Sequence, residues 1–164
     1  MPTNVRAADS LEYPVKATFL YKFASFVEWP AAAFESPTSP VSICVIGTDA
    51  VGALIDQAAA GQRIGAHPIT VIHLQAAAGV SGCHIAYIAE SDAQLIAAAL
   101  DAMKGTPVLT VTDSTHPSGP TGIVSFVVQD NRVRFDIDDA AAAENGLVIS
   151  SKLLSLARSV RPRP

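Results

Sequence analysis

The chain carries little charge for its length. Of its 164 residues, 16% are Asp, Glu, Lys or Arg, and the formal net charge is −4. A nucleic-acid partner demands a clustered basic face, so this balance argues against one. The arginines near the C-terminus, Arg158, Arg161 and Arg163, are too few to change that expectation.

Long apolar runs are lacking as well. No stretch reaches the roughly 18 apolar residues that a spanning helix needs, so we expect no direct insertion into a membrane. The start also lacks the apolar core of a signal peptide, although residues 5–9 look like the small-residue tail of one. We therefore expect residues 1–10 to be a disordered remnant of an export signal or of a trimmed start, followed by a single domain over residues 11–161. A cytoplasmic protein with an unusual start is the alternative.

Metal-binding and catalytic patterns are missing too. The four histidines, His67, His73, His84 and His116, are far apart in the sequence and form no H-x-x-x-H pair. No C-x-x-C pair and no G-x-S-x-G nucleophile elbow occurs. We therefore expect no metal, no cofactor and no catalytic residues, hence a protein that is not an enzyme.

Only two cysteines are present, Cys44 and Cys83. Two buried free thiols that pack as small apolar groups are one interpretation. In an oxidising compartment, an even pair with no cysteine left over favours a disulfide instead. The residues alone leave both interpretations open.

The aromatic residues concentrate in residues 13–30. Their apolar side chains recur at helical spacing, which predicts an amphipathic helix over residues 13–29, with Pro14 in its first turn and Pro30 at its end. The polar side is expected to hold Lys16, Lys22, Ser25 and Glu28. The apolar stripe consists of Val15, Phe19, Phe23, Phe26 and Val27. We expect it to pack on the domain itself rather than on a partner or a membrane surface.

Strand and helix patterns alternate along the rest of the chain. Strands are predicted at residues 41–46, 69–74, 84–89 and 107–112, and a hairpin at residues 123–128 and 132–137. Helices are predicted at residues 50–59, 93–103, 139–145 and 151–160, with Asp49 and either Ser91 or Asp92 as caps. This order predicts an α/β three-layer sandwich with a mostly parallel sheet, an antiparallel C-terminal hairpin at its edge, and helices on both faces.

Ligands of such sheets bind beyond the carboxyl ends of the strands. A candidate ligand cleft at this edge would collect Asp49, Ser91, Asp113 and His116. The glycine-containing turn at residues 47–52 lacks the features of a phosphate loop and is interpreted as a tight connection between a strand and a helix. A small hydrolase that uses Asp113 and His116 is a further hypothesis, weaker than that of polar residues within a loop.

Several blocks of the sequence together resemble one known family. They are Y-P-V-K-A-x-F-L-Y-K-F-A-x-F-V-E-W-P at residues 13–30, C-V-I-G-T-D at 44–49, G-C-H-I-A-Y-I-A at 82–89, P-V-L-T-V-T-D at 107–113, G-I-V-S-F at 122–126, V-R-F-D-I at 133–137 and G-L-V-I-S-S-K-L-L at 146–154. In this order they resemble the YfiR-like family of bacterial periplasmic regulators, over roughly residues 13–160.

The resemblance implies a periplasmic, non-enzymatic regulator. Relatives bind the periplasmic sensor domain of an inner-membrane diguanylate cyclase and repress it, which lowers cyclic di-GMP and limits biofilm formation. An OmpA-like outer-membrane lipoprotein relieves that repression, and a homodimer is a further expectation. The alternative is a periplasmic small-molecule binding domain of a sensor or transport system.

The resemblance also bears on the cysteines. It implies that Cys44 and Cys83 form a disulfide, because relatives have a pair at equivalent blocks. Some relatives carry a second pair near residues 122–126, where this chain has Ser118 and Ser125. Redox control that depends on the second pair is therefore not expected here.

Overall fold

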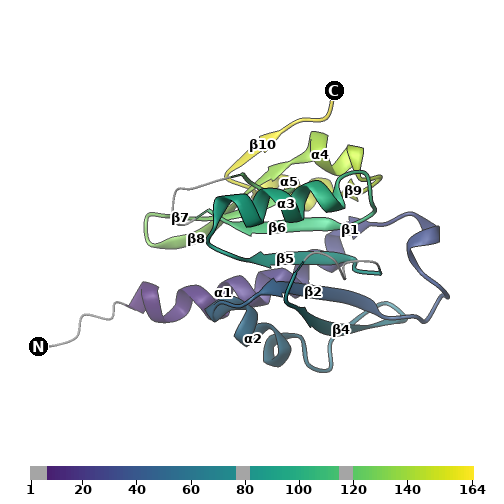
Figure 1. Ribbon diagram of the computed structural model, residues 1–164, viewed down its shortest axis with the longest axis horizontal. Helices are drawn as coiled ribbons and strands as arrows, with labels where there is room; N and C mark the ends of the chain where they lie inside the picture. Colours follow the sequence, from purple (N-terminus) through teal and green to yellow (C-terminus); the bar gives the residue numbers. More distant parts are fainter. Residues whose placement is uncertain (1–6, 77–81, 115–119) are drawn as a thin grey trace, which may run out of the picture.

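Eight strands form one sheet in the order β10-β8-β7-β6-β5-β2-β4-β3 (Figure 1). The computed structural model describes residues 7–76, 82–114 and 120–164. The strands of this sheet are β2 (Val41–Gly47), β3 (Arg63–Ile64), β4 (His67–Leu74), β5 (Ile85–Ala89), β6 (Leu109–Asp113), β7 (Val124–Gln129), β8 (Arg132–Asp138) and β10 (Ser159–Arg161). A separate two-stranded sheet pairs β1 (Val27–Glu28) with β9 (Val148–Ile149).

The central strands run parallel, as expected. β4, β2, β5, β6 and β7 are parallel neighbours, while β3 pairs antiparallel with β4 and β8 pairs antiparallel with β7. The β7–β8 hairpin turns at Asp130 and Asn131, both of which have positive φ angles. Asn and Asp tolerate this conformation, which suits a two-residue hairpin turn.

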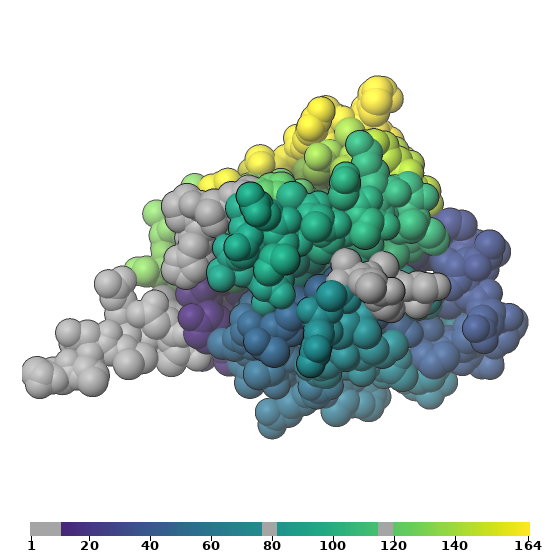
Figure 2. All heavy atoms as spheres, in the orientation of Figure 1, coloured from purple at the N-terminus to yellow at the C-terminus, as the bar shows by residue number. Residues whose placement is uncertain are grey.

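Helices cover both faces of the sheet. They are α1 (Ala7–Lys22), α2 (Ala50–Ala59), α3 (Ala93–Met103), α4 (Asp139–Glu144) and α5 (Ser151–Leu156), with 3-10 turns η1 (Phe23–Phe26) and η2 (Ala31–Ala33). In Figure 1, α3 lies in front of the sheet, with α1 behind it. Figure 2, which has the same orientation, leaves only a small purple area of α1 visible beside the teal α3.

The two faces have separate cores. On the α3 face, Ile46 and Ile88 pack with Ile96 and Met103. The larger core, on the α1 and α2 face, contains Leu20, Phe23, Val45, Ile55, Val111 and Phe126. Two apolar layers around one sheet confirm the predicted three-layer α/β sandwich.

Residues 13–29 do not form one helix. α1 begins at Ala7, so Pro14 lies inside the helix rather than in its first turn, and α1 ends at Lys22. Phe26 is followed by the extended strand β1, which is held because Val27 pairs with Ile149 and the Ser150 N–H donates to the Phe26 carbonyl at 2.8 Å. Long-range backbone bonds thus override the local helical pattern.

The C-terminal end also differs from the expectation. The helix predicted over residues 151–160 stops at Leu156, and the next residues form β10, which pairs in parallel with β8. The hairpin is therefore not the edge of the sheet, because β10 covers β8. The short strands β1, β3, β9 and β10 carry too few residues for a sequence pattern to reveal them.

Candidate functional site

Three of the four predicted cleft residues come together at the carboxyl ends of β2, β5 and β6. Asp49, Ser91 and Asp113 line one cleft of about 340 Å³. His116 lies outside the described residues. Thr48 and Glu90, which the sequence also places at the ends of these strands, line the cleft too. The other lining residues, which were not singled out from the sequence, are Tyr13, Ala50, Val51, Ala89 and Ile96.

Asp49 has structural partners on both carboxylate oxygens. Its Oδ1 accepts from the backbone N–H of Gly52 at 2.7 Å, which caps α2 as predicted. Its Oδ2 accepts from the hydroxyl of Tyr87 at 2.6 Å. Burial, together with the negative charge of Asp49, raises the pKa of Tyr87 far above its ordinary value, so the phenol stays a hydrogen-bond donor.

A fully buried lysine lies beside this cleft. Lys16, on α1, has 0% of its side chain exposed, and its Nζ contacts Glu12 at 2.5 Å and Asp113 at 2.8 Å. The helical pattern had placed Lys16 on the polar, solvent-facing side, and that prediction is wrong. A buried ammonium is retained only when carboxylates compensate for its lost hydration, and these contacts join α1 to the end of β6.

One sequence signal pointed to this cluster. Glu12 precedes Lys16 by four residues, the spacing at which side chains on one helix meet. Asp113 is 97 positions from Lys16, so the contact with β6 had no local signal.

Ser91 and Asp92 have different roles at the start of α3. Asp92 is the cap, since its Oδ1 accepts from the backbone N–H groups of Gln94 and Leu95. Ser91 is left to line the cleft and is exposed. Gly47 begins the turn from β2 to α2 with a φ of +90°, which favours glycine. A Cβ at this position would lie 2.6 Å from Glu90 Oε2, so a larger residue would also clash with Glu90.

The chemistry of the cleft is that of carboxylates held by structural partners. Asp49 caps a helix and Asp113 pairs with Lys16, so both charges already serve the fold. Among residues 7–76, 82–114 and 120–164, no three His, Cys, Asp or Glu side chains gather in a way that would hold a metal ion.

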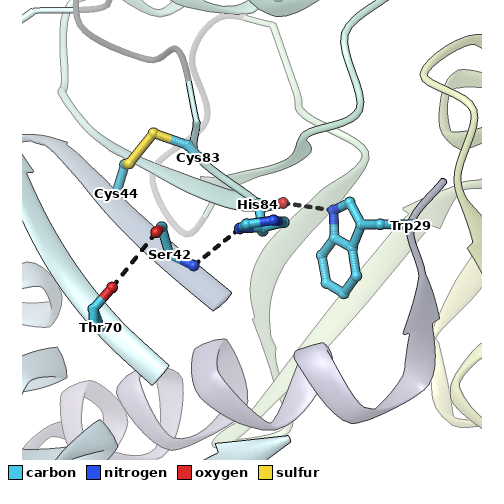
Figure 3. Close-up of a disulfide and its surroundings, with 6 residues drawn as sticks. All are labelled: Trp29, Ser42, Cys44, Thr70, Cys83 and His84. Carbon is cyan, nitrogen blue, oxygen red and sulfur yellow. Dashed lines mark hydrogen bonds between the residues drawn. A yellow bond between two sulfur atoms is a disulfide. The ribbon is translucent and has the colours of Figure 1, made fainter. Parts of the chain in front are cut away.

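The disulfide lies near the amino-terminal start of β5, whereas the cleft lies at the carboxyl ends of the strands (Figure 3). Cys44 of β2 is bonded to Cys83, which precedes β5, in agreement with the pair implied by the resemblance. Figure 3 shows the ring of His84, the next residue, between Ser42 of β2 and Trp29. The bond therefore ties the backbone at His84 to the central strand β2.

Exposed apolar side chains occur on several helices. Leu11 of α1, Leu95 of α3 and Leu156 of α5 are 59%, 53% and 59% exposed, and Tyr13 and Val15 add to the exposed face of α1. Scattered exposed leucines are ordinary, yet apolar groups of this size are what partner surfaces use as anchors.

The sequence profile of the YfiR/HmsC-like family matches residues 13–158. That match includes the cleft and the disulfide described above, and it spans most of the chain, so this chain belongs to the YfiR/HmsC-like family. No curated protein matches it.

Family membership supports a periplasmic regulator of cyclic di-GMP signalling, because regulators rather than enzymes define this family. Within the described part of the chain, none of the helices has both the length and the apolar character required to cross a bilayer.

Proposed function

We propose that this protein represses an inner-membrane diguanylate cyclase by binding the periplasmic sensor domain of that enzyme. The observation that carries the proposal is the family match over residues 13–158. The cleft adds support, since the carboxylates of Asp49 and Asp113 are committed to a helix cap and an ion pair. Turnover of cyclic di-GMP precursors would take place in the partner, with this protein acting by contact alone.

Two further partners belong to this proposal. An OmpA-like outer-membrane lipoprotein would relieve repression by sequestering the protein, and two copies of the protein would form a homodimer. A specific complex with the cyclase would bury at least about 1,000 Å² in total. Exposed apolar side chains would supply its anchors.

Gene deletion tests the proposal. Removing the gene from its host should raise cyclic di-GMP and surface attachment, and an export-competent copy should reverse both effects. Unchanged cyclic di-GMP after deletion, together with failure of any cyclase to co-purify with the protein, would overturn it.

Three substitutions locate the contact surface in the same assay. Leu11→Asp, Leu95→Asp and Leu156→Asp each place a charge at an exposed leucine, on α1, α3 and α5 respectively. The complementing copy should lose repression when the charge falls inside the interface, while the other two variants serve as matched controls. Because all three sites are exposed, each variant should keep the melting temperature of the parent protein.

A periplasmic small-molecule binding domain is the second candidate function. The observation that favours it is the cleft of about 340 Å³ at the carboxyl ends of the strands, where α/β sheets bind ligands. Neighbouring genes separate the two candidates: a membrane cyclase with a periplasmic domain supports the regulator, and a transport operon supports the binding protein.

A further inference from the structure

The segment between β1 and β2, residues 29–40, is attached to the sheet largely through histidines. The indole N–H of Trp29 donates to the backbone carbonyl of His84 at 3.0 Å. The ring of His84 contacts the Ala33 carbonyl through Nε2 at 2.8 Å, and His67 contacts the Ser39 carbonyl through Nδ1 at 2.6 Å. We call this segment the 29–40 strap.

The hydrogen bonds of His84 require a neutral ring. The backbone N–H of Ser42 donates to Nδ1 at 3.0 Å, so Nδ1 carries no proton (Figure 3). The proton is therefore on Nε2, which donates it to the Ala33 carbonyl. A second proton on Nδ1 would point at the N–H of Ser42, and that hydrogen bond would be lost.

The surroundings of His84 oppose a charge. The residue is 5% exposed. Phe34 of the strap lies between the two imidazoles, with ring centroids 4.4 Å from His84 and 4.2 Å from His67. Trp29 meets the His84 ring edge-on at 5.7 Å.

Few titratable groups of the described residues surround this ring. The strap contributes Glu35, which is exposed. β4 contributes His67, whose charge acts against a charge on His84. β2 meets the ring through the backbone N–H of Ser42, and β6 meets the His84 backbone, whose carbonyl accepts from the N–H of Leu109. Cys83 is held in the disulfide, and residues 77–81 contain no titratable side chain.

The direction of the pH effect follows. Burial lowers the pKa of His84 from its ordinary value of 6.5, the hydrogen bond to Ala33 raises it, and His67 lowers it, so the net shift is downward. An opened strap exposes the ring and restores its ordinary affinity for protons. The closed arrangement is therefore fully favoured above pH 6.5 and loses stability as the pH falls below it.

We propose that His84 is a pH-sensitive latch, whose protonation releases the 29–40 strap and uncovers Trp29 and Phe34. The disulfide at Cys83 would keep the backbone of His84 on β2, so the strap moves while the sheet stays in place. Each pH unit below 6.5 raises the opening equilibrium constant by at most about tenfold, since one proton is taken up. This inference is independent of the proposed cyclase partner.

Trp29 reports on the latch, because it is the only tryptophan of the chain. Its fluorescence should shift to longer wavelength, reversibly, from about pH 7.5 to about pH 4.5, while far-UV circular dichroism keeps its sheet signal. His84→Gln should remove this dependence on pH. His73→Gln is the matched control and should keep it, since His73 is exposed and pairs with Asp56 away from the strap.

Two outcomes would overturn the proposal: a Trp29 emission that does not respond to pH, or the same transition in the His84→Gln variant. If that variant does not fold, nuclear magnetic resonance of the parent protein decides. The imidazole signals of His84 and the indole N–H signal of Trp29 should then change with a common midpoint, and separate midpoints would refute the latch.

Discussion

The environment of Lys16 differs from the one that its position in the helical pattern predicts. The apolar stripe of α1 placed it among solvent-facing residues, yet its side chain is fully buried beside Glu12 and Asp113. Hydrophobic periodicity treats every lysine as a surface residue, because it contains no information about a carboxylate that approaches from another strand. Burial of Lys16 is a property of the tertiary fold.

We expect Lys16→Met to lower the free energy of unfolding by about 3–5 kcal/mol, because it leaves two poorly hydrated carboxylates without their cation. Urea denaturation at neutral pH measures the change. Lys22→Met is the matched control, since Lys22 is exposed near the end of the same helix, and its effect should stay within about 0.5 kcal/mol.

Adding Asp113→Asn to Lys16→Met should recover part of the loss, since one uncompensated charge is then removed. Equal effects of the two lysine substitutions would show that the ion cluster contributes nothing measurable to stability.

The elements fall into two groups according to what the sequence reveals. Helices α2 and α3 and the strands of the central sheet follow from local patterns, with caps at Asp49 and Asp92 and stops at Gly61 and Gly105. β1, β9 and β10 each depend on a partner elsewhere in the chain. For the same reason, the helix predicted over residues 13–29 extended too far at its C-terminal end, since α1 ends at Lys22.

Phe23 is the aromatic centre of the η1 turn. It is 1% exposed and lies 5.9 Å from the ring of Phe126 and 5.3 Å from that of Phe135. Phe23→Ala should therefore lower the free energy of unfolding by about 3–5 kcal/mol, because a large cavity replaces the ring. Thermal or urea denaturation provides the measurement.

Leu11→Ala is the control for Phe23→Ala, because Leu11 lies on the exposed side of α1. Leu11 is 59% exposed, so its truncation should change stability by less than about 0.5 kcal/mol. An unchanged stability for Phe23→Ala would mean that this aromatic cluster does not anchor the segment to the sheet.

At the scale of the molecule, the sequence predicted the cleft at the carboxyl ends of the strands better than it predicted the contacts of the 29–40 strap. Asp49, Ser91 and Asp113 were expected together because strand ends in parallel sheets converge. The arrangement of Trp29, Phe34, His67 and His84 was not expected, since an irregular segment that packs on one histidine of β4 and one just before β5 has no periodic pattern.

We propose that residues 11–161 unfold as a single domain, because the larger core joins α1, α2, the sheet and α5. Urea transitions followed by Trp29 fluorescence and by far-UV circular dichroism should then coincide at neutral pH, with the disulfide intact. Two separate midpoints would contradict a single cooperative unit.

The C-terminal strand has a consequence for aggregation. Arg158, just before β10, forms a bidentate pair with Asp136 of β8, and Arg163, just after it, forms another with Asp139 of α4. These pairs hold both ends of β10 in place. The family match ends at residue 158, before β10 begins. A shortened version that ends there would present β8 as a bare edge, with free N–H and C=O groups next to Ile137. Such edges pair with those of other molecules, so we expect the shortened version to aggregate more readily than the full chain.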